Sequence, residues 1–112
     1  MDKIKHYEAI IIQLLEEIGK YYKGTTNPLN LQVIVDEKNR HYQLLMQGWD
    51  ENGYTFQCLC HLDIIDGKVW IQWNDTEEPL EVELMKMGVP ASDIVLGLKR
   101  PEYRQYTDFA LG

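Results

Sequence analysis

The chain has 112 residues and a formal net charge of −7, with 11 Lys and Arg against 18 Asp and Glu. This length fits one domain, predicted over residues 1–112, and allows a stable hydrophobic core without disulfide bonds or a bound metal ion. A nucleic-acid binder draws most of its affinity from cationic neutralisation of phosphates, so the acidic balance argues against direct, non-specific DNA binding. Such a charge usually means only a soluble, self-repelling protein, and more specifically it would suit a basic protein partner.

Neither a membrane segment nor a leader peptide is predicted. The longest apolar run, Ala9–Ile12, falls far short of the ~20 residues that a membrane helix needs. The amino terminus enters a helical pattern directly and lacks the apolar core and small-residue cleavage site of a signal peptide. We therefore predict a cytoplasmic protein. Cys58 and Cys60 stand two residues apart on one predicted strand, so a structural disulfide is not expected.

An amphipathic helix is predicted over residues 3–22. Large apolar residues recur there at alternating spacings of three and four, which is the period of a helix with one apolar face. The residues of this stripe are Ile4, Tyr7, Ile11, Leu14, Ile18 and Tyr21. Fewer than three heptads precede Gly24, which favours packing on a sheet over a coiled coil, although the stripe leaves a homodimer open. The segment 24–30 is rich in turn formers and predicts a loop.

Four strands are predicted after this loop, over residues 31–35, 42–49, 54–65 and 68–73. A polar hairpin joins the first two, and the dipeptides Asn52-Gly53 and Asp66-Gly67 join the others. Both dipeptides tolerate the positive φ angles of type I′ turns, so the flanking strands should be antiparallel neighbours. The pattern therefore predicts a four-stranded antiparallel meander.

Strict alternation along residues 54–65 defines the two faces of this sheet. One face receives a wholly apolar row, which the amino-terminal helix should cover; it consists of Tyr54, Phe56, Cys58, Cys60, Leu62 and Ile64. The opposite row is mixed. Because tryptophan is enriched in binding hot spots, we predict that this mixed face contacts a partner. Its candidate contact residues are Trp49, His61, Asp63, Trp70 and Gln72. The alternative, left open here, is that the carboxy-terminal tail folds over the same face.

A second helix is predicted after residue 75. Asp75 or Thr76 can cap it, Glu78 completes a capping-box spacing, and Leu80, Leu84 and Met87 line one side. The remaining residues, 91–112, form short pieces: a turn of helix at 92–95, an apolar run at 96–98 and a helix at 101–105 with proline first.

The predicted fold class is therefore α+β: an N-terminal amphipathic helix packed on a four-stranded antiparallel meander, followed by a helix and short C-terminal helical segments.

The sequence predicts no catalytic residue, cofactor or metal site. Cys58, Cys60 and His61 include soft metal ligands, but a tetrahedral zinc site needs about four ligands. Strand alternation also points His61 away from both sulfurs. For the same reason Cys60 and His61 cannot share the hydrogen bond of an activated nucleophile. His61 and Asp63 do point the same way and could act as general base and orienter, yet no third group is spaced to complete a relay. A structural pair is therefore the favoured interpretation.

A series of short motifs runs through nearly the whole chain. In order they are His41-Tyr-Gln-Leu44, Gly48-Trp-Asp50, His61-Leu-Asp-Ile64, Gly67-Lys-Val-Trp-Ile-Gln72, Thr76-Glu77, Glu83-Leu84, Gly88-Val-Pro90, Asp93-Ile-Val-Leu-Gly97 and Thr107-Asp-Phe-Ala110. This ordered series resembles the XisI family, the fdxN-element excision controlling factors of cyanobacteria.

The resemblance implies a small α+β protein that assists excision of a DNA element during heterocyst development, alongside a recombinase and a companion factor, XisH. It also implies a controlling factor rather than an enzyme, with no active site to carry over. We therefore expect a non-enzymatic accessory factor that binds a XisH-like protein. The alternatives are a small-ligand-binding protein and an enzymatic or nuclease component that uses His61 and Asp63.

Overall fold

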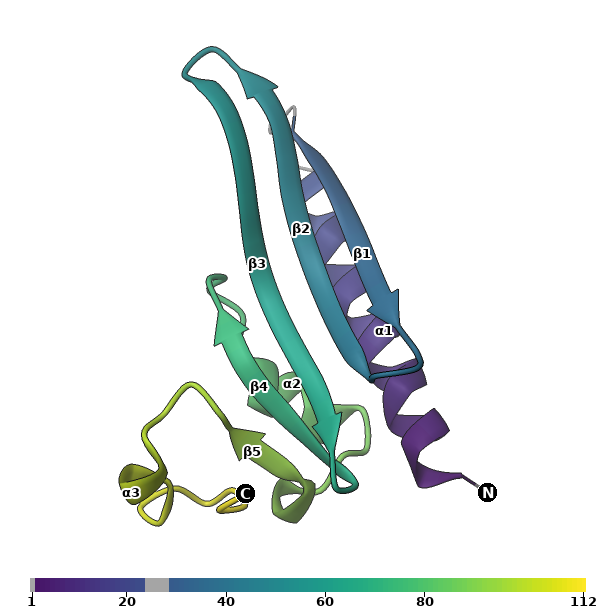
Figure 1. Ribbon diagram of the computed structural model, residues 1–112, viewed down its shortest axis with the longest axis vertical. Coiled ribbons are helices and arrows are strands. Elements are labelled where there is room, and N and C mark those ends of the chain that lie inside the picture. Colours follow the sequence, from purple (N-terminus) through teal and green to yellow (C-terminus); the bar gives the residue numbers. More distant parts are fainter. Residues whose placement is uncertain (1, 24–28) are drawn as a thin grey trace.

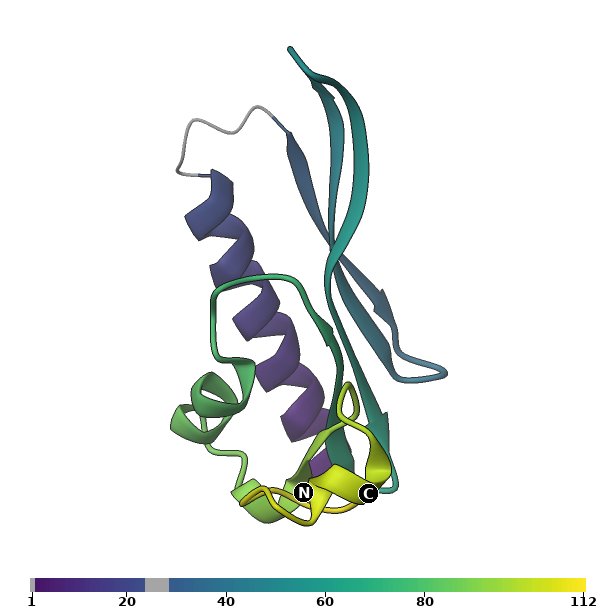
Figure 2. The ribbon, with the colours of Figure 1, turned by 90° about the vertical axis from the view of Figure 1, so that its left-hand side faces the viewer.

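The computed structural model describes residues 2–23 and 29–112 and arranges them in two layers (Figures 1 and 2). One layer is a five-stranded sheet with the strand order β1-β2-β3-β4-β5. The other holds helices α1 and α2, which lie on the same side of the sheet. The strands are β1 (Asn30–Asp36), β2 (His41–Asp50), β3 (Gly53–Ile65), β4 (Lys68–Asn74) and β5 (Ile94–Leu96). The helices are α1 (Lys3–Lys23), α2 (Leu80–Lys86), the 3-10 turn η1 (Ala91–Asp93) and α3 (Pro101–Arg104).

Helix α1 forms as its apolar stripe predicts. Tyr7, Ile11, Leu14 and Ile18 are buried against the sheet, whereas Tyr21 at the end of the stripe is 66% exposed. The buried core around them includes Leu44, Leu62, Ile71, Leu80, Leu84 and Ile94, and Leu31, Val33 and Val35 of β1 are partly buried against it. In the described part of the chain, no helix is both long and apolar enough to cross a membrane. The predicted loop 24–30 lies mostly outside the described residues.

The predicted strand count was too low by one. The fifth strand, β5, pairs in parallel with β4, so that Val69 lies opposite Ile94 and Ile71 opposite Leu96. A parallel pair needs a crossover connection, and α2 supplies it between the two strands. The segment 94–96 was predicted partly as a turn of helix, at 92–95, and partly as an apolar run, at 96–98, because three residues are too few to show a period.

A β-bulge in β3 overturns the predicted row of apolar side chains. Leu44 pairs with Cys60 but Leu45 pairs with Cys58, so Leu59 is an extra residue without a partner in β2. An extra residue shifts the period-two alternation by one, and every side chain beyond it changes face. Cys60, Leu62 and Ile64 are therefore buried under α1, as predicted. Tyr54 and Phe56 lie on the other face instead and are 54% and 65% exposed.

One of the two predicted type I′ turns forms, and the predicted helix cap does not. Asp66 and Gly67 both have positive φ, 52° and 76°, as a type I′ turn requires. At the other hairpin only Gly53 does, with φ 123°, and the two loop residues are Glu51 and Asn52. Neither Asp75 nor Thr76 caps α2, which begins after Pro79 without a side-chain cap.

Asn74 organises the segment before α2. Its Nδ2 donates to the Glu78 carbonyl at 2.8 Å, and its Oδ1 accepts from the backbone N–H of Thr76 at 3.0 Å. These hydrogen bonds take the place of the predicted capping box.

The amino-terminal end of α1 is fastened to η1 by polar contacts. The Tyr7 hydroxyl donates to Asp93, and Lys3 Nζ lies 3.0 Å from the same carboxylate oxygen. Burial raises the pKa of Tyr7, with help from the Asp93 hydrogen bond, to about 12. Burial acts to raise the pKa of Asp93 as well, but the hydrogen bonds from Tyr7 and Lys3 hold it below its ordinary value. These contacts join the first helix to the start of the carboxy-terminal tail.

The bulge predicts contrasting stabilities for two apolar residues of β3. Leu62→Ala should lower the free energy of unfolding by about 2–5 kcal/mol because it opens a cavity under α1. Phe56→Ala should change it by about 0.5 kcal/mol or less, since that ring is mostly exposed. Urea unfolding of both variants measures the difference. Equal losses would mean that strict alternation holds and the bulge is wrong.

Asp93→Asn should lower the free energy of unfolding near neutral pH by about 1–2 kcal/mol, because it weakens charge-assisted hydrogen bonds. A lowered folded-state pKa stabilises the protein above the unfolded value of 3.8, and this stabilisation is lost as the pH falls through the folded value. The difference from the native protein should therefore shrink in acid. Urea unfolding across this pH range tests it, with the exposed Asp108→Asn as control. A difference that does not shrink in acid would contradict the assignment.

Candidate functional site

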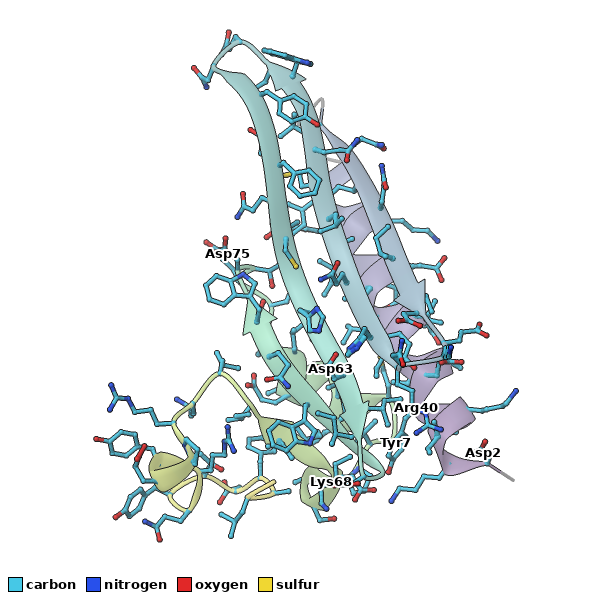
Figure 3. All side chains as sticks on the ribbon, in the orientation of Figure 1. Asp2, Tyr7, Arg40, Asp63, Lys68 and Asp75 are labelled. Carbon is cyan, nitrogen blue, oxygen red and sulfur yellow. The ribbon has the colours of Figure 1, made fainter. Side chains whose placement is uncertain are left out.

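Three titratable side chains meet on the face of the sheet that α1 does not cover. Asp63 and His61 lie two residues apart on β3 and so point the same way, and the β2–β3 register places His41 directly opposite Asp63. The Asp63 Oδ1 atom lies 2.6 Å from His41 Nδ1 and 2.7 Å from His61 Nε2. Figure 3 shows the labelled Asp63 on this face, with the helix layer behind it. One carboxylate oxygen thus joins two imidazoles.

Two glutamines complete the network. Gln43 Nε2 lies 2.9 Å from His61 Nδ1, and Gln72 Nε2 donates to Asp63 Oδ2 at 3.3 Å. Asp63 is the one buried charged residue of the described chain, at 8% exposure, whereas half of the His41 side chain is exposed. The hydrogen bond to Asp63 raises the pKa of His41, because the carboxylate stabilises the imidazolium. In the described part of the chain, the ion-pair partners of Asp63 are therefore these two histidines.

A shallow pocket opens beside this network. It has a volume of about 280 Å³ and is lined by Ile34, Asp36, His41, Gln43 and His61. The two histidine rings lie 5.8 Å apart between centroids, with their planes tilted by 40°. Solvent and small ions can therefore reach the imidazoles from the open face.

A second part of the open face, near the tip of the β2–β3 hairpin, is aromatic. Trp49, Tyr54 and Phe56, which we call the aromatic patch, lie near the tip of the β2–β3 hairpin and are 72%, 54% and 65% exposed. The Trp49 and Tyr54 rings pack edge to face with 5.3 Å between centroids. The hairpin tip extends past the end of α1 in both views of the ribbon (Figures 1 and 2). This surface is apolar, large and remote from the core.

The carboxy-terminal tail covers a third part of the open face, around Trp70. The Arg104 guanidinium lies over the Trp70 ring, 5.0 Å from its centroid. Arg104 Nε also donates to the carbonyls of Leu96 and Lys99, each at 3.2 Å. Gly97 passes so close to Gln72 that a Cβ there would stand 2.3 Å from its side-chain oxygen. The tail therefore covers the mixed face around Trp70, as the alternative interpretation predicted, whereas Trp49 stays exposed.

The structure separates the five predicted contact residues into three groups. His61, Asp63 and Gln72 belong to the polar network, Trp49 to the aromatic patch, and Trp70 to the tail contact. Partner binding by any of them stays a prediction, and Trp70 is better placed to anchor the tail. Sequence reasoning missed His41. Counting back from the Asn52-Gly53 turn without the bulge would have placed Ile64 opposite His41, so the pairing with Asp63 has no local signal in the sequence. Sequence reasoning also missed Tyr54 and Phe56, because nothing in the alternation marks the bulge.

The cysteines are poorly placed for nucleophilic chemistry. Both are free, and Cys60 is fully buried on the face opposite His61. Burial raises the pKa of the Cys60 thiol to about 12, so it is protonated at neutral pH. The Cys58 thiol donates to the Cys60 carbonyl at 3.2 Å. Neither thiol is therefore activated as a nucleophile in this position.

Comparison with known proteins decides the family. A model of the XisI protein family matches residues 1–111. The chain belongs to the XisI family. A XisI-like protein from Anabaena variabilis ATCC 29413, known from its crystal structure, shares 37% sequence identity with this chain. The two structures match with a TM-score of 0.86 over 97% of this chain and 99% of that one. The family expected from the ordered motifs is thereby confirmed.

A second XisI structure is similar over the full length. The fdxN element excision controlling factor XisI from the same Anabaena strain is 30% identical with a TM-score of 0.79, and the match covers 99% of this chain and 100% of that one. A search of curated proteins finds no match. The two relatives together show that the helix, sheet and tail described above form a shared XisI fold.

The tail of this XisI-family chain should loosen when Arg104 is lost. Arg104→Ala removes the guanidinium that stacks on Trp70 and binds tail carbonyls, so the Ala110 amide, which donates to the Ile94 carbonyl at 2.8 Å, should exchange faster. Hydrogen exchange measures the effect, and the exposed Arg100→Ala is the matched control. Unchanged protection of Ala110 would show that Arg104 does not hold the tail.

Proposed function

We propose that this chain is a non-enzymatic accessory factor of programmed DNA element excision, and that it acts by binding a XisH-like protein. The family match and the fdxN element excision name of one solved relative support the process. The mode of action rests on one observation, the exposed aromatic patch at the tip of the β2–β3 hairpin.

The aromatic patch has the character of a binding hot spot. Three large rings, each more than half exposed, stand together on a hairpin that extends past the helix layer. Exposed aromatic clusters are costly to hydrate, and burial of Trp and Tyr at the centre of an interface supplies much of its affinity. A partner that covers Trp49, Tyr54 and Phe56 would gain from the burial of all three.

Charge favours a basic partner. Between residues 41 and 65 the hairpin carries three acidic residues, Asp50, Glu51 and Asp63, and neither Lys nor Arg. Asp50 and Glu51 flank the aromatic patch at the hairpin tip. An acidic rim of this kind speeds encounter with a positive surface and repels nucleic-acid phosphates. The chain would therefore influence DNA excision through a protein that itself contacts DNA.

The outer edge of β3 offers a further means of docking. β4 pairs only with residues 60–65 of β3, so in the described part of the chain residues 53–58 pair with β2 on one edge and with no strand on the other. A free strand edge presents backbone N–H and carbonyl groups that can pair with an incoming strand. The free edge adjoins the aromatic patch, so one partner could use both.

Binding of a purified XisH-like protein tests the proposal. The double variant Trp49→Ala, Phe56→Ala should raise the dissociation constant by at least about tenfold, since each hot-spot truncation costs about 2 kcal/mol or more of binding free energy. Tyr106→Ala is the matched control, because that ring is 79% exposed but lies on the tail. Biolayer interferometry at low and physiological salt measures both.

A second double variant separates the contribution of charge to binding from that of the aromatic rings. Asp50→Asn combined with Glu51→Gln should slow association and reduce its salt dependence while leaving the dissociation rate nearly unchanged. The proposal fails if the native chain shows no association at micromolar concentration at either salt. It also fails if Tyr106→Ala weakens binding as much as loss of the aromatic patch.

A further inference from the structure

We propose that His41, His61 and Asp63 form a binding site for one divalent transition-metal ion, with zinc as the best match. Each residue offers one ligand atom, and the three atoms lie within 4.8 Å of one another. The site lies at the opposite end of the open face from the aromatic patch. It does not depend on the proposed partner, so the two proposals can fail separately.

The donor set suits zinc. Neutral imidazole nitrogen and carboxylate oxygen are common zinc ligands, and three protein ligands leave at least one coordination position for water or another group. Calcium and magnesium prefer sites built from oxygen alone, which argues against them here. The two histidines and one carboxylate therefore indicate a transition metal.

The spacing needs only a small adjustment. His41 Nδ1 and His61 Nε2 lie 2.6 and 2.7 Å from the Asp63 oxygen, as hydrogen-bonded atoms do. Tetrahedral ligands around zinc, with bonds of about 2.0–2.2 Å, lie about 3.4 Å apart. The imidazoles would have to withdraw by less than about 1 Å, and His41 is free to move because half of its side chain is exposed.

The surrounding amides can hold the ligands in place. A zinc-bound His61 Nε2 requires the proton on Nδ1, and Gln43 lies 2.9 Å from that atom. Rotation of the Gln43 amide would present its oxygen as acceptor, which is an ordinary adjustment for a glutamine. Gln72 meanwhile donates to the second Asp63 oxygen at 3.3 Å. Partners of this kind fix the tautomer and orientation of metal ligands.

Electrostatics point in the same direction. Asp63 is buried, yet among residues 2–23 and 29–112 its ion-pair partners are the two histidines, and neither Lys nor Arg reaches it. A buried carboxylate is costly unless it is paired or coordinates a metal ion. A divalent cation between the three side chains would supply a positive charge beside Asp63. The pocket of about 280 Å³ beside them gives an ion access from solvent.

Calorimetric titration of the untagged full chain with zinc chloride tests this site. We expect one ion per chain, and a loss of affinity of at least about tenfold in both His41→Gln and His61→Gln. His6→Gln is the matched control, because His6 is the one histidine outside the proposed site and lies exposed on α1. It should bind zinc as the native chain does. Circular dichroism verifies that each variant is folded.

Cobalt(II) absorption provides a second measurement. Cobalt in a site of nitrogen and oxygen ligands should give visible bands without a sulfur-to-metal charge-transfer band, and Cys58→Ser should leave the spectrum unchanged. The proposal is overturned if the native chain binds no zinc. It is equally overturned if His41→Gln and His61→Gln bind as tightly as His6→Gln, or if the cobalt spectrum shows thiolate ligation.

Discussion

One extra residue in β3, Leu59, determines what each face of the sheet presents. Without it, the rings of Tyr54 and Phe56 would point to the same face as Cys60 and Leu62. With it, the alternation shifts by one, so that this apolar row of β3 lies in the core along one half of the strand and on the open face along the other. The aromatic patch exists because of this shift.

The open face then divides into three regions of different chemistry. At the tip, the exposed rings are flanked by Asp50 and Glu51, which would suit a basic protein. At the opposite end of the β2–β3 hairpin, Asp63 joins two imidazoles and two amides in one polar network with the donor set of a metal site. Beside it on β4, Arg104 and the tail cover Trp70. The proposed docking surface and the proposed ion site thus lie on one face of the sheet, while α1 and α2 cover the opposite face.

The sequence predicted the features that depend on local periodicity and turn chemistry. The stripe of α1, four of the five strands, the Asp66-Gly67 turn and the His61–Asp63 pair all follow from spacing of a few residues. The bulge could not be predicted, since Leu59 is an ordinary strand residue and only pairing with β2 reveals it. β5 was missed because its parallel pairing with β4 is non-local, and His41 because it joins Asp63 across the sheet.

The most direct test of this account is nuclear magnetic resonance of the side chains in the presence of a paramagnetic cosolute. The account predicts strong broadening of the Trp49, Tyr54 and Phe56 ring protons, with Leu62 and Ile64 methyl groups protected. It also predicts no nuclear Overhauser contact between the Phe56 ring and the core residues of α1. A protected Phe56 ring in contact with Leu15 or Ile18 would contradict the bulge and, with it, the docking surface built upon it.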